Sequence, residues 1–222
     1  MKPMHMIAIG AGAFVAYRAW VAYQQTYGDA GAASADKSSG WMQGAGDILT
    51  GAAQSIDSMT GGFMKISAMA NVQADALNSA NVRAMLAVIR TGEGTTGAAG
   101  YQTLFGGAKF ASLDDHPRIL VKRSGLASTA AGAYQMLSST WDETKRIMNL
   151  PDFGQASQDM AAIGRMAARG ALADVLRGDF KTAIAKLGKE WASLPGSNYG
   201  QPVMTMAKAT QVYISNGGQV TA

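Results

Sequence analysis

The sequence predicts an α+β fold that is mostly helical, with one small β-hairpin, preceded by an apolar helix and a Gly/Ala-rich extension. Apolar residues between positions 82 and 89 recur at i, i+3, i+4 and i+7, the spacing of one helix face. The run Tyr101–Phe105 favours a strand and ends at Gly106-Gly107, which is typical of a hairpin. From Asn81 onward the Gly, Ala, Ser and Met-rich texture gives way to that of a compact domain. We therefore expect that domain to span residues 81–222.

Residues 4–23 form a run of small and apolar residues interrupted only by His5 and Arg18. About 20 residues is the length that crosses a bilayer core. Lys2 precedes the run and Asp29 is the first charge after it, so the positive-inside tendency places the amino terminus in the cytoplasm and exports the rest. An uncleaved membrane anchor, a docking helix buried in a protein assembly and a cleaved signal peptide all remain open for residues 1–27.

Residues 28–80 are predicted to be a Gly/Ala/Ser/Met-rich linker with weak amphipathic helices. The stretch 28–40 shows no periodicity, whereas apolar residues in 41–72 are compatible with one or two helices. This segment is either a spacer that packs on a partner or one that contacts a membrane or lines a conduit, because Met-rich helices adapt to several surfaces. We expect membrane or virion proteins to bind through residues 1–80.

Four further helices are predicted between residue 138 and the C-terminus from capping residues and apolar spacing. In chain order they are one capped by Ser138 or Ser139 and stopped at Pro151, one capped by Ser157 with Asp159 in its first turn, one from Phe180 up to Trp191, and one from near Pro202 to Gly217-Gly218. Trp141 and Trp191 lie at helical spacing and are predicted to belong to the core.

Composition limits the classes of partner. The net charge of +4 is mild and its basic residues are spread out, so we expect no nucleic acid. A positive excess suits a polyanionic substrate or a membrane surface. The chain has no Cys, and His5 and His116 are far apart in sequence, so we predict neither a metal site nor a cofactor.

Glu93 lies between Gly92 and Gly94, directly after the periodic stretch, and Gly92 is predicted to end the helix there. A carboxylate at the C-terminal end of a helix meets the negative end of the helix dipole, which favours the protonated form. An acid that stays neutral near pH 7 is what general acid catalysis of glycoside cleavage requires. The alternative is a solvated glutamate in a turn.

A series of short motifs then resembles the lambda-type phage endolysins over about residues 81–218. In order, the motifs are Glu93-Gly94-Thr95, Gly100-Tyr101, Gly106-Gly107, Asp115-His116-Pro117-Arg118, Ser128-Thr129-Ala130-Ala131-Gly132-Ala133-Tyr134-Gln135, Trp141-Asp142, Asp152-Phe153, Ser157-Gln158-Asp159, Arg169-Gly170-Ala171-Leu172, Trp191-Ala192-Ser193-Leu194-Pro195-Gly196 and Tyr199-Gly200-Gln201.

The resemblance implies a lysozyme-like fold and a lytic transglycosylase that cleaves the MurNAc–GlcNAc β-1,4 bond of peptidoglycan. It assigns Glu93 as a single acid/base and a 1,6-anhydro sugar as the product. The residues agree in one respect: no second acid has a compelling position, and Asp115 within Asp-His-Pro-Arg is more readily explained by capping or an ion pair. A hydrolytic glycosidase usually needs two carboxylates.

The resemblance also suggests substrate-binding residues. It places Tyr134 and Gln135 along the cleft, after a small-residue turn that lets the backbone approach a glycan. Without it, Tyr134 reads as a core aromatic. Tyr199 is a candidate for stacking on a sugar, although loop packing explains it equally well. Gln102 stands where related proteins often carry an acid, so it is kept as a cleft residue with reduced capacity to stabilise an oxocarbenium ion.

Two settings and one different class of function remain open. The enzyme is either a virion component that opens the cell wall during genome entry, which the long extension favours, or a signal-anchored endolysin at the host inner membrane facing the periplasm. The other class is a structural virion protein whose lysozyme-like domain binds glycan with weak or no turnover.

Overall fold

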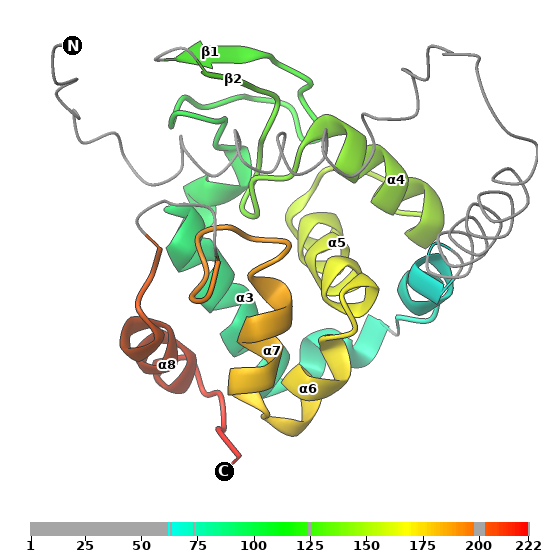
Figure 1. Cartoon of the computed structure of the whole chain (residues 1–222). Helices are drawn as coiled ribbons and strands as arrows, with labels where there is room; N and C mark the ends of the chain where they lie inside the picture. Colours follow the sequence, from blue (N-terminus) through cyan, green and yellow to red (C-terminus); the bar gives the residue numbers. More distant parts are fainter. Residues whose placement is uncertain (1–61, 63, 73, 124–125, 198–202, 222) are drawn as a thin grey trace, which may run out of the picture.

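The computed structural model describes residues 62, 64–72, 74–123, 126–197 and 203–221, drawn in colour in Figure 1. Predictions that concern residues 1–61, including the apolar run 4–23, and the predicted sugar-stacking residue Tyr199 lie outside these residues. Within them, no helix combines the length and apolarity that a bilayer crossing requires.

Helix α3 (Ala80–Glu93) runs through the middle of the fold, packed against α5, α6 and α8. Ser79 begins it, since its side chain accepts a hydrogen bond from the amide of Val82. Gly94 ends it in the left-handed conformation, with φ of 69°. The predicted apolar face is confirmed, because its four residues are all buried: Val82, Met85, Leu86 and Ile89.

Besides a helical segment over residues 64–70, the described part of the chain forms five helices in addition to α3, and the mostly helical prediction is confirmed. They are α4 (Ser138–Met148), α5 (Gln155–Ala168), α6 (Leu172–Arg177), α7 (Phe180–Leu187) and α8 (Met206–Ser215), with 3-10 helices η2 (Ala74–Asn78) and η3 (Ala98–Gln102). The short helix α6 was not predicted, because six residues are too few to show a clear helical period.

Two predicted helix starts are wrong in detail. Leu137 is the N-cap of α4, and the amide of Ser138 donates to the Thr129 hydroxyl at 3.2 Å. Gly154 is the N-cap of α5, and Asp152 accepts from its amide and from the hydroxyl of Ser157. In both cases the side-chain oxygen that accepts from the amide at the helix start belongs to a residue before the helix, Thr129 or Asp152. The first serine within each helix therefore does not mark where that helix begins.

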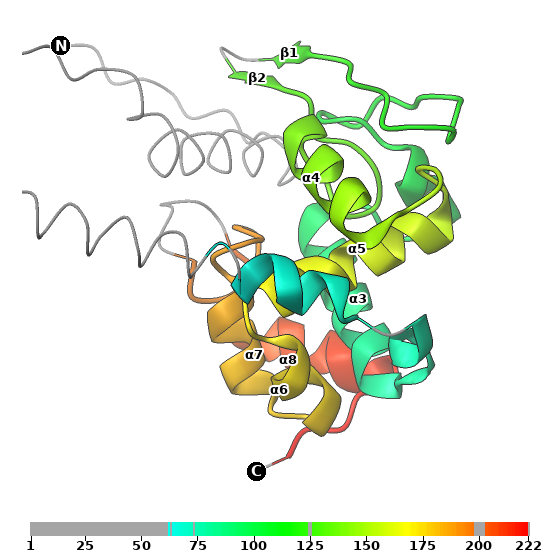
Figure 2. The ribbon, with the colours of Figure 1, turned by 90° about the vertical axis from the view of Figure 1, so that its right-hand side faces the viewer.

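The sheet has two antiparallel strands, β1 (Val121–Arg123) and β2 (Leu126–Ser128), with Val121 opposite Ser128. The predicted hairpin at Tyr101–Phe105 forms only in part: Thr103 makes an antiparallel bridge to Lys109 across the turn at Gly106-Gly107, whereas Tyr101 lies in η3 and not in a strand. Burial of the Tyr101 side chain overrides the local strand preference. Figure 2 shows the β1–β2 hairpin at one end of the fold and α6 at the other.

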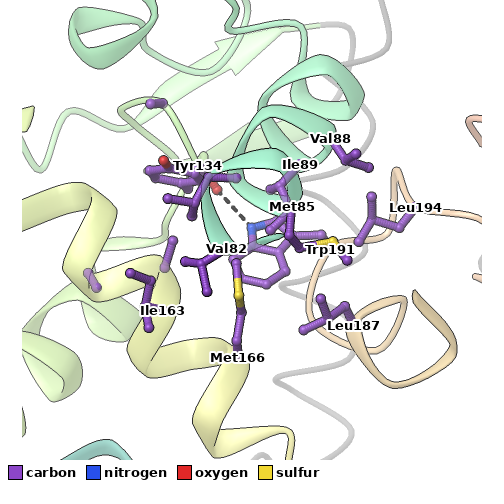
Figure 3. Packing of buried hydrophobic residues seen from close by; sticks show 14 of the residues in the cluster. Val82, Met85, Val88, Ile89, Tyr134, Ile163, Met166, Leu187, Trp191 and Leu194 are labelled. Carbon is purple, nitrogen blue, oxygen red and sulfur yellow. Dashed lines mark hydrogen bonds between the residues drawn. The ribbon is translucent and has the colours of Figure 1, made fainter. Parts of the chain in front are cut away.

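The main core surrounds α3, and Figure 3 shows part of it. Trp141 and Trp191 are buried as predicted. Residues preceding the compact domain also contact it: Ala76 of η2 is part of the core, and Lys65 forms a 3.0 Å ion pair with Glu143 of α4. The end of the predicted linker is therefore packed on the domain.

Candidate active site

The carboxyl group of Glu93 lies in the protein interior at the end of α3, where the residue is only 2 % exposed. The hydroxyl of Ser193 donates to Oε1 at 2.8 Å, whereas Oε2 is buried without a hydrogen-bond partner in the described part of the chain. Burial raises the pKa of Glu93 to about 8, and the Ser193 hydrogen bond offsets only part of that rise. Glu93 is therefore protonated at pH 7, and the solvated-turn interpretation is wrong.

The segment that carries Ser193 approaches α3 closely at Gly92. A Cβ atom at position 92 would lie 2.5 Å from the Ser193 hydroxyl oxygen and 3.0 Å from its Cβ. The amide of Met204 donates to the Ser193 carbonyl at 2.9 Å, which fixes the same segment from its other side. Glycine at position 92 thus permits the contact that orients the acid.

A third segment, the turn Gly132–Gln135, meets the loop that follows Glu93. The hydroxyl of Thr95 donates to the carbonyl of Ala133. The indole of Trp191 donates to the carbonyl of Tyr134 at 3.2 Å, drawn as the dashed line in Figure 3. The end of α3, this turn and the Trp191–Ser193 segment are therefore joined by hydrogen bonds around Glu93.

The predicted substrate residues are placed differently from one another. The side chain of Tyr134 is buried, and its hydroxyl donates to Asp159 at 2.5 Å. Gln135 has a φ of 47° and donates from Nε2 to two carbonyls, those of Thr103 and Gly132. Both belong to the turn beside the Glu93 loop. Gln102 instead donates from Nε2 to the carbonyls of residues 110 and 111.

Two residues of this site were missed by sequence reasoning. Ser193 lies in the Trp191–Gly196 motif and Asp159 in the Ser157–Asp159 motif, but the sequence assigns neither residue a role in the site. Ser193 lies 100 residues from Glu93, so no local pattern could connect them. Their occurrence in ordered motifs was the one available signal.

The other acids considered are engaged elsewhere. Asp115 forms ion pairs with Arg118 and Lys145 and accepts from the Trp141 indole, as its sequence context predicted. Although burial opposes it, the hydrogen bonds from Trp141 and Arg118 hold the pKa of Asp115 well below its usual range. Asp114 accepts from the Ser112 hydroxyl. Within the described residues, no acid forms a pair with Glu93.

His116 is a buried, hydrogen-bonded structural residue. Nε2 lies 3.0 Å from the carbonyl of Met136, and Nδ1 accepts from the amide of Arg118. No group of three or more His, Cys, Asp or Glu residues in the described part of the chain is arranged to hold a metal ion.

Comparison with known proteins gives one consistent family. The endolysin family profile matches residues 83–220. The endolysin of Escherichia phage lambda is 42% identical over 126 residues, which cover 54% of this chain and 80% of the relative. The endolysin of Escherichia phage P2 is 35% identical over 154 residues, covering 62% of this chain and 93% of the relative.

Solved structures agree with these sequence matches. The lysozyme of bacteriophage lambda complexed with a chitohexasaccharide has a TM-score of 0.61 and 38% identity, covering 64% of this chain and 97% of that one. A second structure of the lysozyme from bacteriophage lambda has a TM-score of 0.57 and 37% identity, with the same coverage.

Proposed function

Because the chain belongs to the endolysin family, we propose that its wall-cleaving reaction is that of a lytic transglycosylase with Glu93 as the single acid/base. The observation that carries this proposal is the state of Glu93, a buried carboxyl group whose pKa burial raises to about 8 and whose hydrogen-bond partner is the hydroxyl of Ser193 and not a second acid. A retaining hydrolase needs a second carboxylate about 5–5.5 Å from the first, and an inverting one needs it further away.

The chemistry requires two proton transfers, both through the carboxyl group of Glu93. Glu93 donates its proton to the glycosidic oxygen as the bond from that oxygen to C1 of the muramoyl sugar breaks. The Glu93 carboxylate then accepts the proton of the C6 hydroxyl on the same sugar, and the C6 oxygen bonds to C1. The 1,6-anhydro ring closes, Glu93 is protonated again and no water is consumed. The substrate supplies the nucleophile.

The glycan strand is the proposed substrate, and the chitohexasaccharide bound to the lambda lysozyme supports a saccharide ligand for this family. We propose that the turn carrying Tyr134 and Gln135 lines the glycan-binding face through its backbone, because both side chains are occupied by internal hydrogen bonds. Gln102 and Tyr199 remain proposed cleft residues.

Product analysis in heavy-oxygen water tests the reaction. Purified peptidoglycan is digested with the full chain and the muropeptides are analysed by mass spectrometry. We expect anhydro-muropeptides without incorporated heavy oxygen, and no release by Glu93→Gln. Reducing-end muramic acid that carries the heavy oxygen would show hydrolysis instead.

We further propose that the enzyme is a virion component and that residues 1–80 attach it to virion or membrane proteins. The support is the length of chain that precedes the family match at residue 83. Immunoblots of purified particles and of host membranes should detect the protein in particles. Its restriction to membranes would favour a signal-anchored lysis enzyme, and an unchanged phenotype with Glu93→Gln would favour a structural role.

A further inference from the structure

Asp159 of α5 lies where two tyrosine side chains from different segments converge. Its Oδ1 accepts hydrogen bonds from the hydroxyl of Tyr101, at 2.8 Å, and from that of Tyr134, at 2.5 Å. Tyr101 comes from η3, and Tyr134 comes from the turn Gly132–Gln135. One carboxylate oxygen therefore joins η3 to the turn.

The preceding residue, Gln158, holds the same two segments through their backbones. Its Oε1 accepts from the amide of Ala133 at 2.8 Å, and its Nε2 donates to the carbonyl of Tyr101 at 3.0 Å. Gln158 is 2 % exposed, and a Cβ atom at Gly132 would lie 2.3 Å from its Oε1. Gln158 and Asp159, which we call the α5 clamp, thus hold η3 and the turn Gly132–Gln135 together, Gln158 through backbone groups and Asp159 through the two tyrosine hydroxyls.

The α5 clamp connects to the loop that follows Glu93. Arg90 lies with its guanidinium 4.5 Å from the centre of the Tyr101 ring, and it donates to the Tyr101 hydroxyl and to the carbonyls of Thr95 and Gly97. On the other side, the Thr95 hydroxyl donates to the carbonyl of Ala133. The loop is thereby fixed from η3 and from the turn.

The hydroxyl groups of Tyr101 and Tyr134 keep their protons well above neutral pH. Burial raises the pKa of Tyr101 to about 12 and that of Tyr134 well above its usual range. Both hydroxyls therefore remain donors to Asp159 at neutral and mildly alkaline pH.

We propose that Gln158 and Asp159 are positioning residues of the acid/base site, which hold η3 and the turn Gly132–Gln135 so that Glu93 meets the glycosidic oxygen at the reactive geometry. This role rests on the proposed function of Glu93. The clamp residues act through Tyr101, Tyr134 and Thr95 and need not touch the substrate.

Substitutions at Asp159 test the clamp in the full chain. With Asp159→Ala we expect kcat on peptidoglycan to fall about tenfold to a hundredfold, with KM changed less than about threefold, because misplacing a catalytic group by ~1 Å costs up to about that factor. Asp159→Asn keeps an acceptor oxygen for both hydroxyls and should restore kcat to within about threefold of wild type. Gln155→Ala, at an exposed position of the same helix, is the matched control and should leave kcat unchanged.

A double-mutant cycle separates positioning from general loss of stability. Tyr101→Phe and Tyr134→Phe each remove one hydroxyl, and each should lower kcat by about threefold to tenfold while the protein stays folded. Combined with Asp159→Ala, their effects on kcat should be less than additive, since the same bonds have already been removed. Wild-type kcat in both Phe variants, or in a folded Asp159→Ala, would overturn the proposal.

Amide hydrogen exchange keeps this test separate from that of the proposed function. We expect Asp159→Ala to speed exchange at the amides of Thr95 and Ala133, with Gln155→Ala unchanged. Faster exchange in a protein whose wild type cleaves no peptidoglycan would refute the proposed function and leave the clamp standing. Unchanged exchange together with unchanged turnover would refute the clamp itself.

Discussion

Glu93 and Glu190 are two shielded glutamates in opposite electrostatic states. Glu93 has one neutral partner, the Ser193 hydroxyl, and burial raises its pKa to about 8. Glu190, whose side chain is 9 % exposed, forms 2.6 Å ion pairs with Arg165 and with Arg169. Burial opposes its ionisation too, yet the two guanidinium groups outweigh that cost and lower the pKa of Glu190 to about 2.

The comparison shows that burial alone does not keep a carboxyl group protonated at neutral pH. A desolvated carboxyl group keeps its proton at neutral pH only where cations are absent. Ser193 follows Glu190 by three positions, so one segment carries both a structural ion pair and the hydroxyl that binds the Glu93 carboxyl group. Two arginines, Arg165 on α5 and Arg169 at its C-terminal end, lie beside Glu190 and keep it ionised, whereas Glu93 has no ion-pair partner in the described part of the chain.

Removing Arg165 should give the largest effect on stability. Arg165 is 6 % exposed and pairs with both Glu143 and Glu190, so Arg165→Met leaves Glu190 with one cation. We expect the free energy of unfolding to fall by about 3 kcal/mol, as for other broken buried pairs. Urea denaturation measures it. Arg146→Met, at an exposed arginine of the neighbouring helix, is the control and should change stability little. An equal decrease in the free energy of unfolding for the two variants would show that the buried ion pairs of Arg165 contribute no more to stability than an exposed arginine does.

Matched Glu→Gln substitutions should change stability in opposite directions. The raised pKa of Glu93 means that its contribution is full below about pH 4.5 and is lost as the pH rises to about 8. Glu93→Gln should therefore stabilise the protein at pH 8, on the order of 2 kcal/mol.

The contribution of Glu190 to stability is present above its unfolded pKa and is lost as the pH falls toward 2. Glu190→Gln should therefore destabilise the protein at pH 7.

Thermal unfolding of both variants from pH 2 to pH 8 measures these opposite trends. The wild type serves as the common reference, and each difference should shrink where the relevant carboxyl group is protonated in both states. Destabilisation by Glu93→Gln at pH 8 would contradict a protonated Glu93.

Ser193→Ala should give a smaller effect, on the pH profile of activity. Activity of a protonated acid declines as the pH rises through the pKa of Glu93, which is about 8. The Ser193 hydrogen bond lowers that pKa, so its loss should move the alkaline limb of kcat/KM upward by up to about one pH unit. Ser139→Ala, at an exposed serine, is the control. A limb that stays in place would show that Ser193 does not stabilise the Glu93 carboxylate.

Much of the helical framework could be predicted because its signals are local. The apolar period identified α3, although the helix continues through Gly92, its predicted end, and stops at Gly94, which adopts the left-handed conformation. Predictions failed where distant residues decide: Thr129 caps α4, and burial of Tyr101 places η3 where a strand was expected. For the site, sequence identified Glu93, whereas Ser193 and the clamp residue Asp159 emerge only when segments far apart in the chain meet.

By itself, the sequence determined that a lone glutamate follows the central helix and that its motifs resemble those of phage endolysins. Only the tertiary structure decided that this glutamate is protonated at neutral pH. Helix ends and apolar faces follow from neighbours a few residues apart. The pKa of a buried carboxyl group depends instead on which residues, distant in sequence, exclude water from it and which place a charge beside it. Glu93 lies beside one neutral hydroxyl, whereas Glu190 lies beside two guanidinium groups.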